Sequence, residues 1–171
     1  MQLTQPRFAL KLLLSAFFLT PDSALTNTEE GYIAGHGALE VFNAPGFMLT
    51  PTWVQVWVCF LAITFIVGFY YARKHPLARW TSGGFILSTA GGSMSFALLG
   101  LPFLGGSIAI MHILCWLPGL VLLLIHRPFL DTKEPAGFRI WAGTITGVIL
   151  FSFIFDIRDA AIYIGHLNGT G

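Results

Sequence analysis

Charged side chains are scarce in this sequence. Lys, Arg, Asp and Glu make up 10% of its 171 residues, whereas soluble domains carry about 25%. A chain with so few charges cannot cover a globular surface with polar groups, so a lipid bilayer must solvate part of it. The net charge of +1 also gives no basic surface of the kind that nucleic acids require, and we expect no nucleic-acid partner.

The sequence also lacks the motifs of common enzyme classes. It contains no Walker-type phosphate loop, no HExxH helix and no Gly-x-Ser-x-Gly nucleophile elbow. Its two cysteines, Cys59 and Cys115, lie in apolar runs and form neither a CxxC motif nor a secreted-type disulfide framework. These absences argue against an enzyme without deciding the question.

Long runs without charge are what the sequence does contain. The run from Thr52 to Tyr71 is long enough to cross a hydrocarbon core of about 30 Å. Residues 81–125 contain no Asp, Glu, Lys or Arg and suit two spans. Pro102 and its neighbouring glycines mark the break between them. The sequence therefore predicts an all-α polytopic membrane protein, whose four-helix transmembrane domain covers residues 52–155. Its spans lie near residues 52–71, 82–100, 105–125 and 138–155.

Residues 1–24 have the pattern of a signal peptide. Arg7 and Lys11 supply positive charge ahead of a short apolar core, and Ala24 could precede the cleavage site. Asp22 stands where a small neutral residue is expected. An uncleaved N-terminal helix is therefore the alternative to a signal peptide.

Basic residues concentrate in two of the predicted loops, residues 72–80 and residues 126–139. Four spans place both loops on one side, and the positive-inside rule makes that side cytoplasmic. Both termini are then extracytoplasmic. We expect residues 25–51 to form a loop or cap on that face and residues 156–171 to form a tail.

Small residues recur at helical spacing in two of the predicted spans. In lipid, such residues let helix backbones approach closely. We favour packing within the bundle, and the alternative is a docking face for another membrane protein or a second copy of the chain. The helix-packing candidates are Gly84, Ser88, Gly91, Ser95, Gly143 and Gly147.

His112 is an ionisable residue well inside a predicted span, which makes it a candidate functional residue. Cys115, Cys59 and Met94 fall at similar depth, and imidazole, thiolate and thioether ligands together suit a soft metal such as Cu(I). Haem b would need a second axial ligand, and no other histidine lies at this depth. We favour a packed, hydrogen-bonded histidine and no cofactor, with copper and haem b as alternatives.

Two functions follow from these patterns. The first is a non-catalytic accessory or interaction subunit of a membrane assembly, which the small-residue faces and the sparse polar groups favour. The second is a minimal transporter or channel, or a metal- or haem-binding redox membrane protein, centred on His112.

Overall fold

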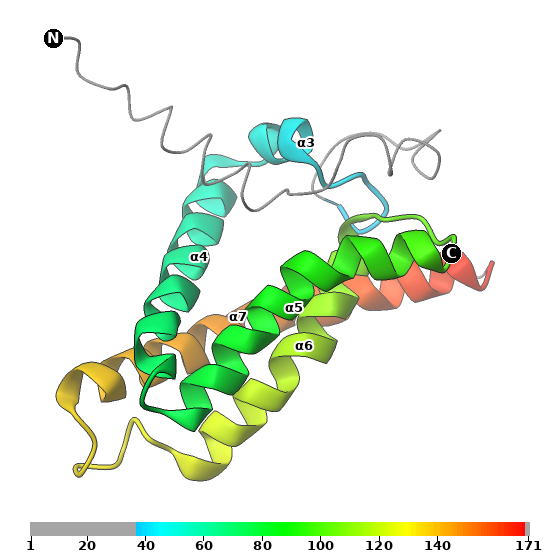
Figure 1. The fold of residues 1–171 in the computed structure, drawn as a ribbon. Helices are drawn as coiled ribbons and strands as arrows, with labels where there is room; N and C mark the ends of the chain where they lie inside the picture. The colour runs from blue at the N-terminus through cyan, green and yellow to red at the C-terminus, as the bar shows by residue number, and fades with distance from the viewer. Residues whose placement is uncertain (1–36, 170–171) are drawn as a thin grey trace, which may run out of the picture.

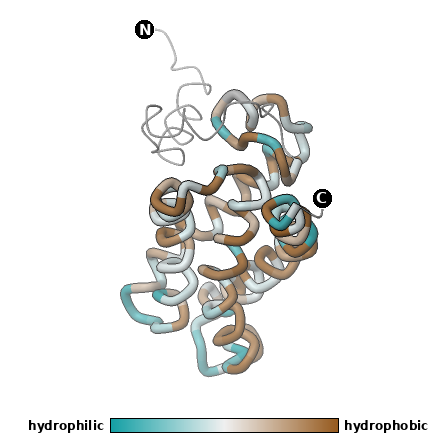
Figure 2. The backbone as a smooth tube through the Cα atoms, turned by 90° about the vertical axis from the view of Figure 1, so that its right-hand side faces the viewer, coloured by the Kyte–Doolittle hydropathy of each residue, from teal (hydrophilic) through white to brown (hydrophobic). Residues whose placement is uncertain are grey.

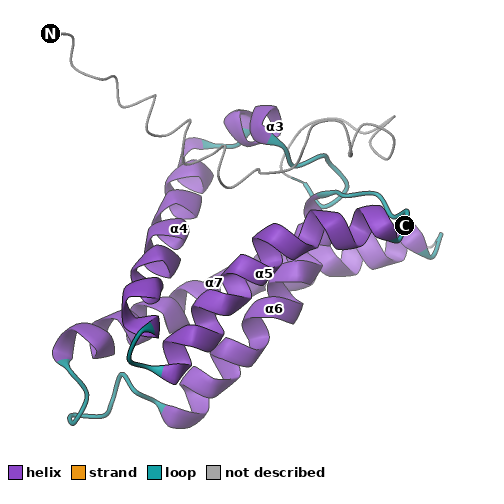
Figure 3. Ribbon diagram, viewed as in Figure 1, coloured by secondary structure: helices purple, strands orange, loops and turns teal. Residues whose placement is uncertain are grey.

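A computed structural model of the chain describes residues 37–169, so the predicted signal peptide at residues 1–24 lies outside the described part. Helices joined by short loops make up this part of the chain, and no strand occurs in it (Figure 3). The prediction of an all-α fold is confirmed. The helices are α3 (Ala44–Leu49), α4 (Thr52–Ala72), α5 (Pro76–Leu98), α6 (Gly105–His126) and α7 (Ala136–Leu167).

Three of these helices, α4, α6 and α7, are long and apolar enough to cross a membrane. Many large apolar side chains on the helices are exposed, among them Ile63, Leu114 and Ile140. Their natural surroundings are lipid tails, so the chain is a multi-pass membrane protein. At about 1.5 Å per residue α5 is long enough to cross as well, but its glycine, serine and threonine content makes it less apolar.

The helices α5, α6 and α7 run beside one another, while α4 leans away from them toward its N-terminal end (Figure 1). The close contacts are those of α5 with α6, α6 with α7, and α4 with α5 and α7. Hydrophilic residues gather in the loops that join the helices (Figure 2). The α4–α5 and α6–α7 loops lie at the same end of the bundle, where His75 Nδ1 is 3.5 Å from Glu134 Oε2.

Aromatic rings and interhelical hydrogen bonds hold the centre of the bundle. Phe65 of α4 stacks on Phe85 of α5 at 4.6 Å and contacts Trp116 of α6 at 4.9 Å. The indole N–H of Trp116 donates to Ser88 Oγ at 2.9 Å. Such contacts matter because lipid offers helices little hydrophobic drive to associate, so packing and hydrogen bonds must supply the attraction.

The segment that precedes α4 covers the start of α6. The backbone N–H groups of Gly105 and Gly106 donate to the carbonyl oxygens of Glu40 and Ala38 at 2.9 and 2.8 Å. The first N–H groups of a helix have no partner within the helix. Backbone carbonyl groups in the predicted cap therefore accept hydrogen bonds from two of these N–H groups.

The last helix is longer than expected. We expected the fourth span to end near Phe155, at a charged group, and a tail to follow, but α7 continues to Leu167. Beyond Phe155 it still has a buried face, which includes Ala160 and Tyr163. The Tyr163 hydroxyl donates to the carbonyl oxygen of Pro102 at 2.6 Å. Charge predicts where a span leaves lipid, whereas packing against a neighbour decides where the helix ends.

Candidate functional site

A pocket of about 380 Å³ opens where α4 diverges from α6 and α7. Its walls come from the N-terminal halves of α4 and α6 and from the C-terminal half of α7. Trp57 of α4 meets Phe151 of α7 edge to face at 4.6 Å. Most of the lining is apolar or aromatic and includes Trp53, Trp57, Leu61, Ile108, Phe151 and Phe155.

A histidine and a carboxylate meet in the wall of this pocket. His112 Nδ1 of α6 lies 3.3 Å from Asp156 Oδ1 of α7, and both side chains are largely buried. The His112 ring also stacks on Trp116 at 3.9 Å, with 17° between the planes. The imidazole is thus held by a polar contact on one side and by a flat aromatic surface on another.

Two oxygen atoms in the same wall have no hydrogen-bond partner within the described residues. They are Asp156 Oδ2 and Ser152 Oγ, and both are buried. Ser152 is only 7% exposed. The two residues are four apart on α7, so their side chains share one face of the helix. Leaving a buried polar group unsatisfied costs about 1–3 kcal/mol, and these two atoms keep a hydrogen-bonding capacity that no described residue uses.

An ion pair between an arginine and a carboxylate also lines this pocket. Arg158 Nη1 is 3.6 Å from Asp159 Oδ1, and the Arg158 side chain is 74% exposed. The structure pairs Arg158 with Asp159 and leaves Asp156 to His112.

Of the four residues proposed as soft-metal ligands, only His112 lines this pocket. Cys115 borders a separate groove between α5 and α6, and Met94 is 62% exposed. Cys59 is half-buried on α4. Residues 37–169 contain no group of three or more His, Cys, Asp or Glu side chains that could hold a metal ion. The copper and haem b sites stay predictions from the sequence.

The small residues of α5 differ in what they contact. A Cβ atom on Gly84 would overlap the carbonyl oxygen of Cys115, so this glycine marks a close approach of α5 and α6. Ser88 accepts the hydrogen bond from Trp116. Gly91 and Ser95 contact mainly their own helix, since the Ser95 hydroxyl donates to the Gly91 carbonyl oxygen at 2.7 Å.

The two glycines of α7 are not buried between helices. A Cβ atom on Gly143 would lie 3.5 Å from Phe129 Cβ, and one on Gly147 would have no neighbour within 4 Å among the described residues. Close contact between helices thus occurs at Gly84 and Ser88, whereas Gly147 faces open space among the described residues.

Sequence reasoning identified His112 but missed its partners. We expected a hydrogen-bonded histidine, and its partner is Asp156, 44 residues away on α7. The available signal was the spacing of Ser152 and Asp156, which places a hydroxyl and a carboxylate on one helix face near the end of an apolar run.

The chain has no significant match to a protein-family model, to a curated protein or to a solved structure.

Proposed function

We propose that this protein binds a small, largely apolar molecule within the membrane, in the pocket between α4, α6 and α7. The observation that carries the proposal is the pair of buried, unpartnered oxygens of Ser152 and Asp156 in the wall of an otherwise apolar pocket. Ligand sites are typically apolar cavities with a few polar groups that fix orientation. Ionisable residues within a span are also costly to keep. A membrane carrier, channel or redox protein centred on His112 would use such a site.

We infer further that α5 is a fourth span. The contact between His75 and Glu134 holds the α4–α5 and α6–α7 loops at one end of the bundle. The helices α4 and α6 thus both finish at that end, and the chain between them must return across the bilayer. Several hydroxyls of α5 donate to backbone carbonyls, as Thr81 does to Leu77 and Ser88 to Phe85, which lowers the cost of placing these side chains within a bilayer.

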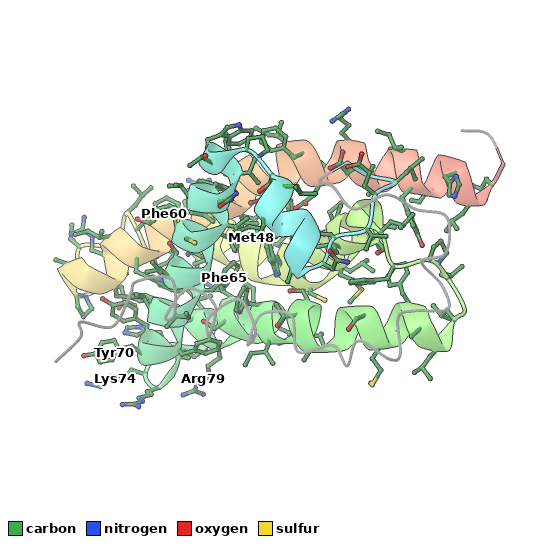
Figure 4. The ribbon with its side chains drawn as sticks, turned by 90° about the horizontal axis from the view of Figure 1, so that it is seen from above. Met48, Phe60, Phe65, Tyr70, Lys74 and Arg79 are labelled. Atoms are coloured by element: carbon green, nitrogen blue, oxygen red, sulfur yellow. The ribbon has the colours of Figure 1, made fainter. Side chains whose placement is uncertain are left out.

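The end with the His75–Glu134 contact is the proposed cytoplasmic side. Lys74 and Arg79 lie close to Tyr70 around the α4–α5 turn (Figure 4). With Arg73, Arg127, Lys133 and Arg139, they place six basic residues at this end. Basic residues in short loops favour the cytoplasm. Both ends of the described segment, where the cap and the end of α7 lie, then face outward.

A cysteine-labelling experiment tests the crossing and its direction. In a background without Cys59 and Cys115, Leu99→Cys should react with a membrane-impermeant maleimide on intact cells. Lys133→Cys should react only after lysis. Reaction of both from the same side would contradict a fourth span.

An interaction subunit is the second candidate function. The observation in its favour is the exposed surface of α7 at Gly147, which no described side chain covers. Small residues on a helix surface allow another helix to approach closely. Gly147→Leu should then displace a partner chain from the complex isolated in mild detergent while leaving the pocket unaffected.

Quenching of tryptophan fluorescence tests the pocket. Trp53 and Trp57 line it, whereas Trp80 borders the groove on the other side of α6. Bromine quenches indole fluorescence at contact, so a bromophenyl probe that enters the pocket should quench saturably. The probes are 4-bromobenzylamine, 4-bromobenzyl alcohol and 4-bromobenzoate, tested on the full chain in detergent micelles.

The double variant Trp53→Phe/Trp57→Phe should lose the saturable component, and the control Trp80→Phe should keep it. Linear quenching alone, with all three probes, means that they only partition into the micelle. That result would overturn the proposed site.

A further inference from the structure

We infer that the pocket takes an organic ammonium ion that carries at least one N–H group on an apolar body. This inference rests on the proposed binding function and names the chemical class of the ligand. Three properties of the pocket support this ligand class: its aromatic walls, its hydrogen-bond acceptors and the charges of its lining residues.

The walls favour a cation. Phe42, Trp53, Trp57, Phe151 and Phe155 contribute rings to the lining. The faces of aromatic rings carry negative potential and attract ammonium groups, most strongly in surroundings without water. A neutral ligand would gain only apolar contact from the same rings.

The unpartnered polar atoms in the wall can accept hydrogen bonds. Asp156 Oδ2, when the carboxyl is ionised, can only accept, and Ser152 Oγ has lone pairs available. An Nδ1–H of neutral His112 that donates to Asp156 leaves Nε2 as an acceptor too. A ligand with N–H donors complements this set. The side-chain donors that a carbonyl or carboxylate ligand would meet are the Ser152 hydroxyl, the indole N–H groups of Trp53 and Trp57, and Arg158, which is paired with Asp159.

The charges that line the pocket also leave room for one positive charge. With His112 neutral, the described residues that line the pocket carry two carboxylates, Asp156 and Asp159, and one cation, Arg158. Arg158 is paired with Asp159 and is mostly exposed. The net charge of these side chains is therefore −1, centred on Asp156. A neutral His112 gives the Asp156 carboxylate a hydrogen bond but no compensating charge, and a bound ammonium ion would supply that charge.

The matched bromophenyl probes distinguish this inference from the proposed function. They share one apolar body and differ in the head group, which at pH 7 is cationic in 4-bromobenzylamine, neutral in the alcohol and anionic in the benzoate. In the wild-type protein we expect the amine to give the lowest half-saturation concentration for pocket quenching. Amine binding should also exceed that of its trimethylammonium analogue, which has no N–H.

The variant Asp156→Asn should weaken amine binding about 10- to 100-fold, the range for losing one hydrogen bond to a charged group. Binding of the alcohol, which carries no charge, should weaken less than binding of the amine. Asp131→Asn, in the exposed α6–α7 loop, is the control and should bind like wild type.

Equal or tighter pocket binding of the alcohol or the benzoate in wild type would overturn the ammonium assignment and leave the proposed binding function intact. Absence of saturable quenching with every probe would overturn both. The comparison of the three probes on the wild-type protein needs no variant, so it tests the ammonium assignment even where Asp156→Asn does not fold.

Discussion

Replacing Gly84 by alanine tests the packing of α5 on α6. A Cβ atom at this position would overlap the carbonyl oxygen of Cys115 and lie 3.1 Å from its carbonyl carbon. Both atoms belong to the backbone of α6, so no side-chain rotation relieves the overlap and one helix must move. Overpacking of this kind costs about 1–3 kcal/mol. A change of 1 kcal/mol shifts Tm by about 2–4 °C in a chain of this size, so Tm should fall by roughly 2–12 °C.

Gly83 provides the matched control for this prediction. It neighbours Gly84 on the same helix, and a Cβ atom there would have nothing within 4 Å among the described residues. Alanine has the higher helix propensity, so Gly83→Ala should leave Tm unchanged or raise it slightly. Thermal unfolding of both variants in one detergent, followed by circular dichroism, measures the difference. A Gly84→Ala protein as stable as Gly83→Ala would refute the close approach of the two helices.

Three further substitutions test contacts elsewhere in the bundle. Ser88→Ala should lower the free energy of unfolding by about 1–3 kcal/mol, because it leaves the buried indole N–H of Trp116 without an acceptor; an unchanged denaturation curve would show that this bond contributes nothing. Tyr163→Phe removes the hydrogen bond to the Pro102 carbonyl and should cost about 0.5–1.5 kcal/mol, which the same unfolding assay can detect. Gly147→Ala should leave the stability of the isolated chain unchanged, since a Cβ atom there meets no described neighbour. A marked loss of stability would show that the surface of α7 at Gly147 is packed against another part of the chain.

The helical class and the membrane location could be predicted from the sequence because both depend on local properties. A run without charge long enough to cross lipid has few alternatives to a helix, since every backbone polar group must be satisfied within the segment. The α5–α6 connection also falls in the glycine- and proline-rich stretch around Pro102. Gly100 there adopts a φ of +63°, which few other residues tolerate.

The arrangement of the site could not be predicted, because it depends on how the helices lie relative to one another. The depth of His112 along its span follows from counting residues, but its pairing with Asp156 follows from the register of α6 against α7. The pocket itself exists because α4 leans away from its neighbours, and no residue pattern in α4 encodes that angle.

The way α4 attaches to the bundle has a consequence for the order of assembly. The close contacts of α5 with α4 and α6, and of α6 with α7, join neighbours along the chain, so they can form as each helix leaves the ribosome. Among the close contacts between helices in residues 37–169, that of α4 with α7 joins the two ends of the transmembrane segment. The pocket lies between these two helices and α6, so it is completed last. A molecule that binds there would therefore favour the closed bundle over its partly assembled precursor and raise the yield of folded protein in the cell.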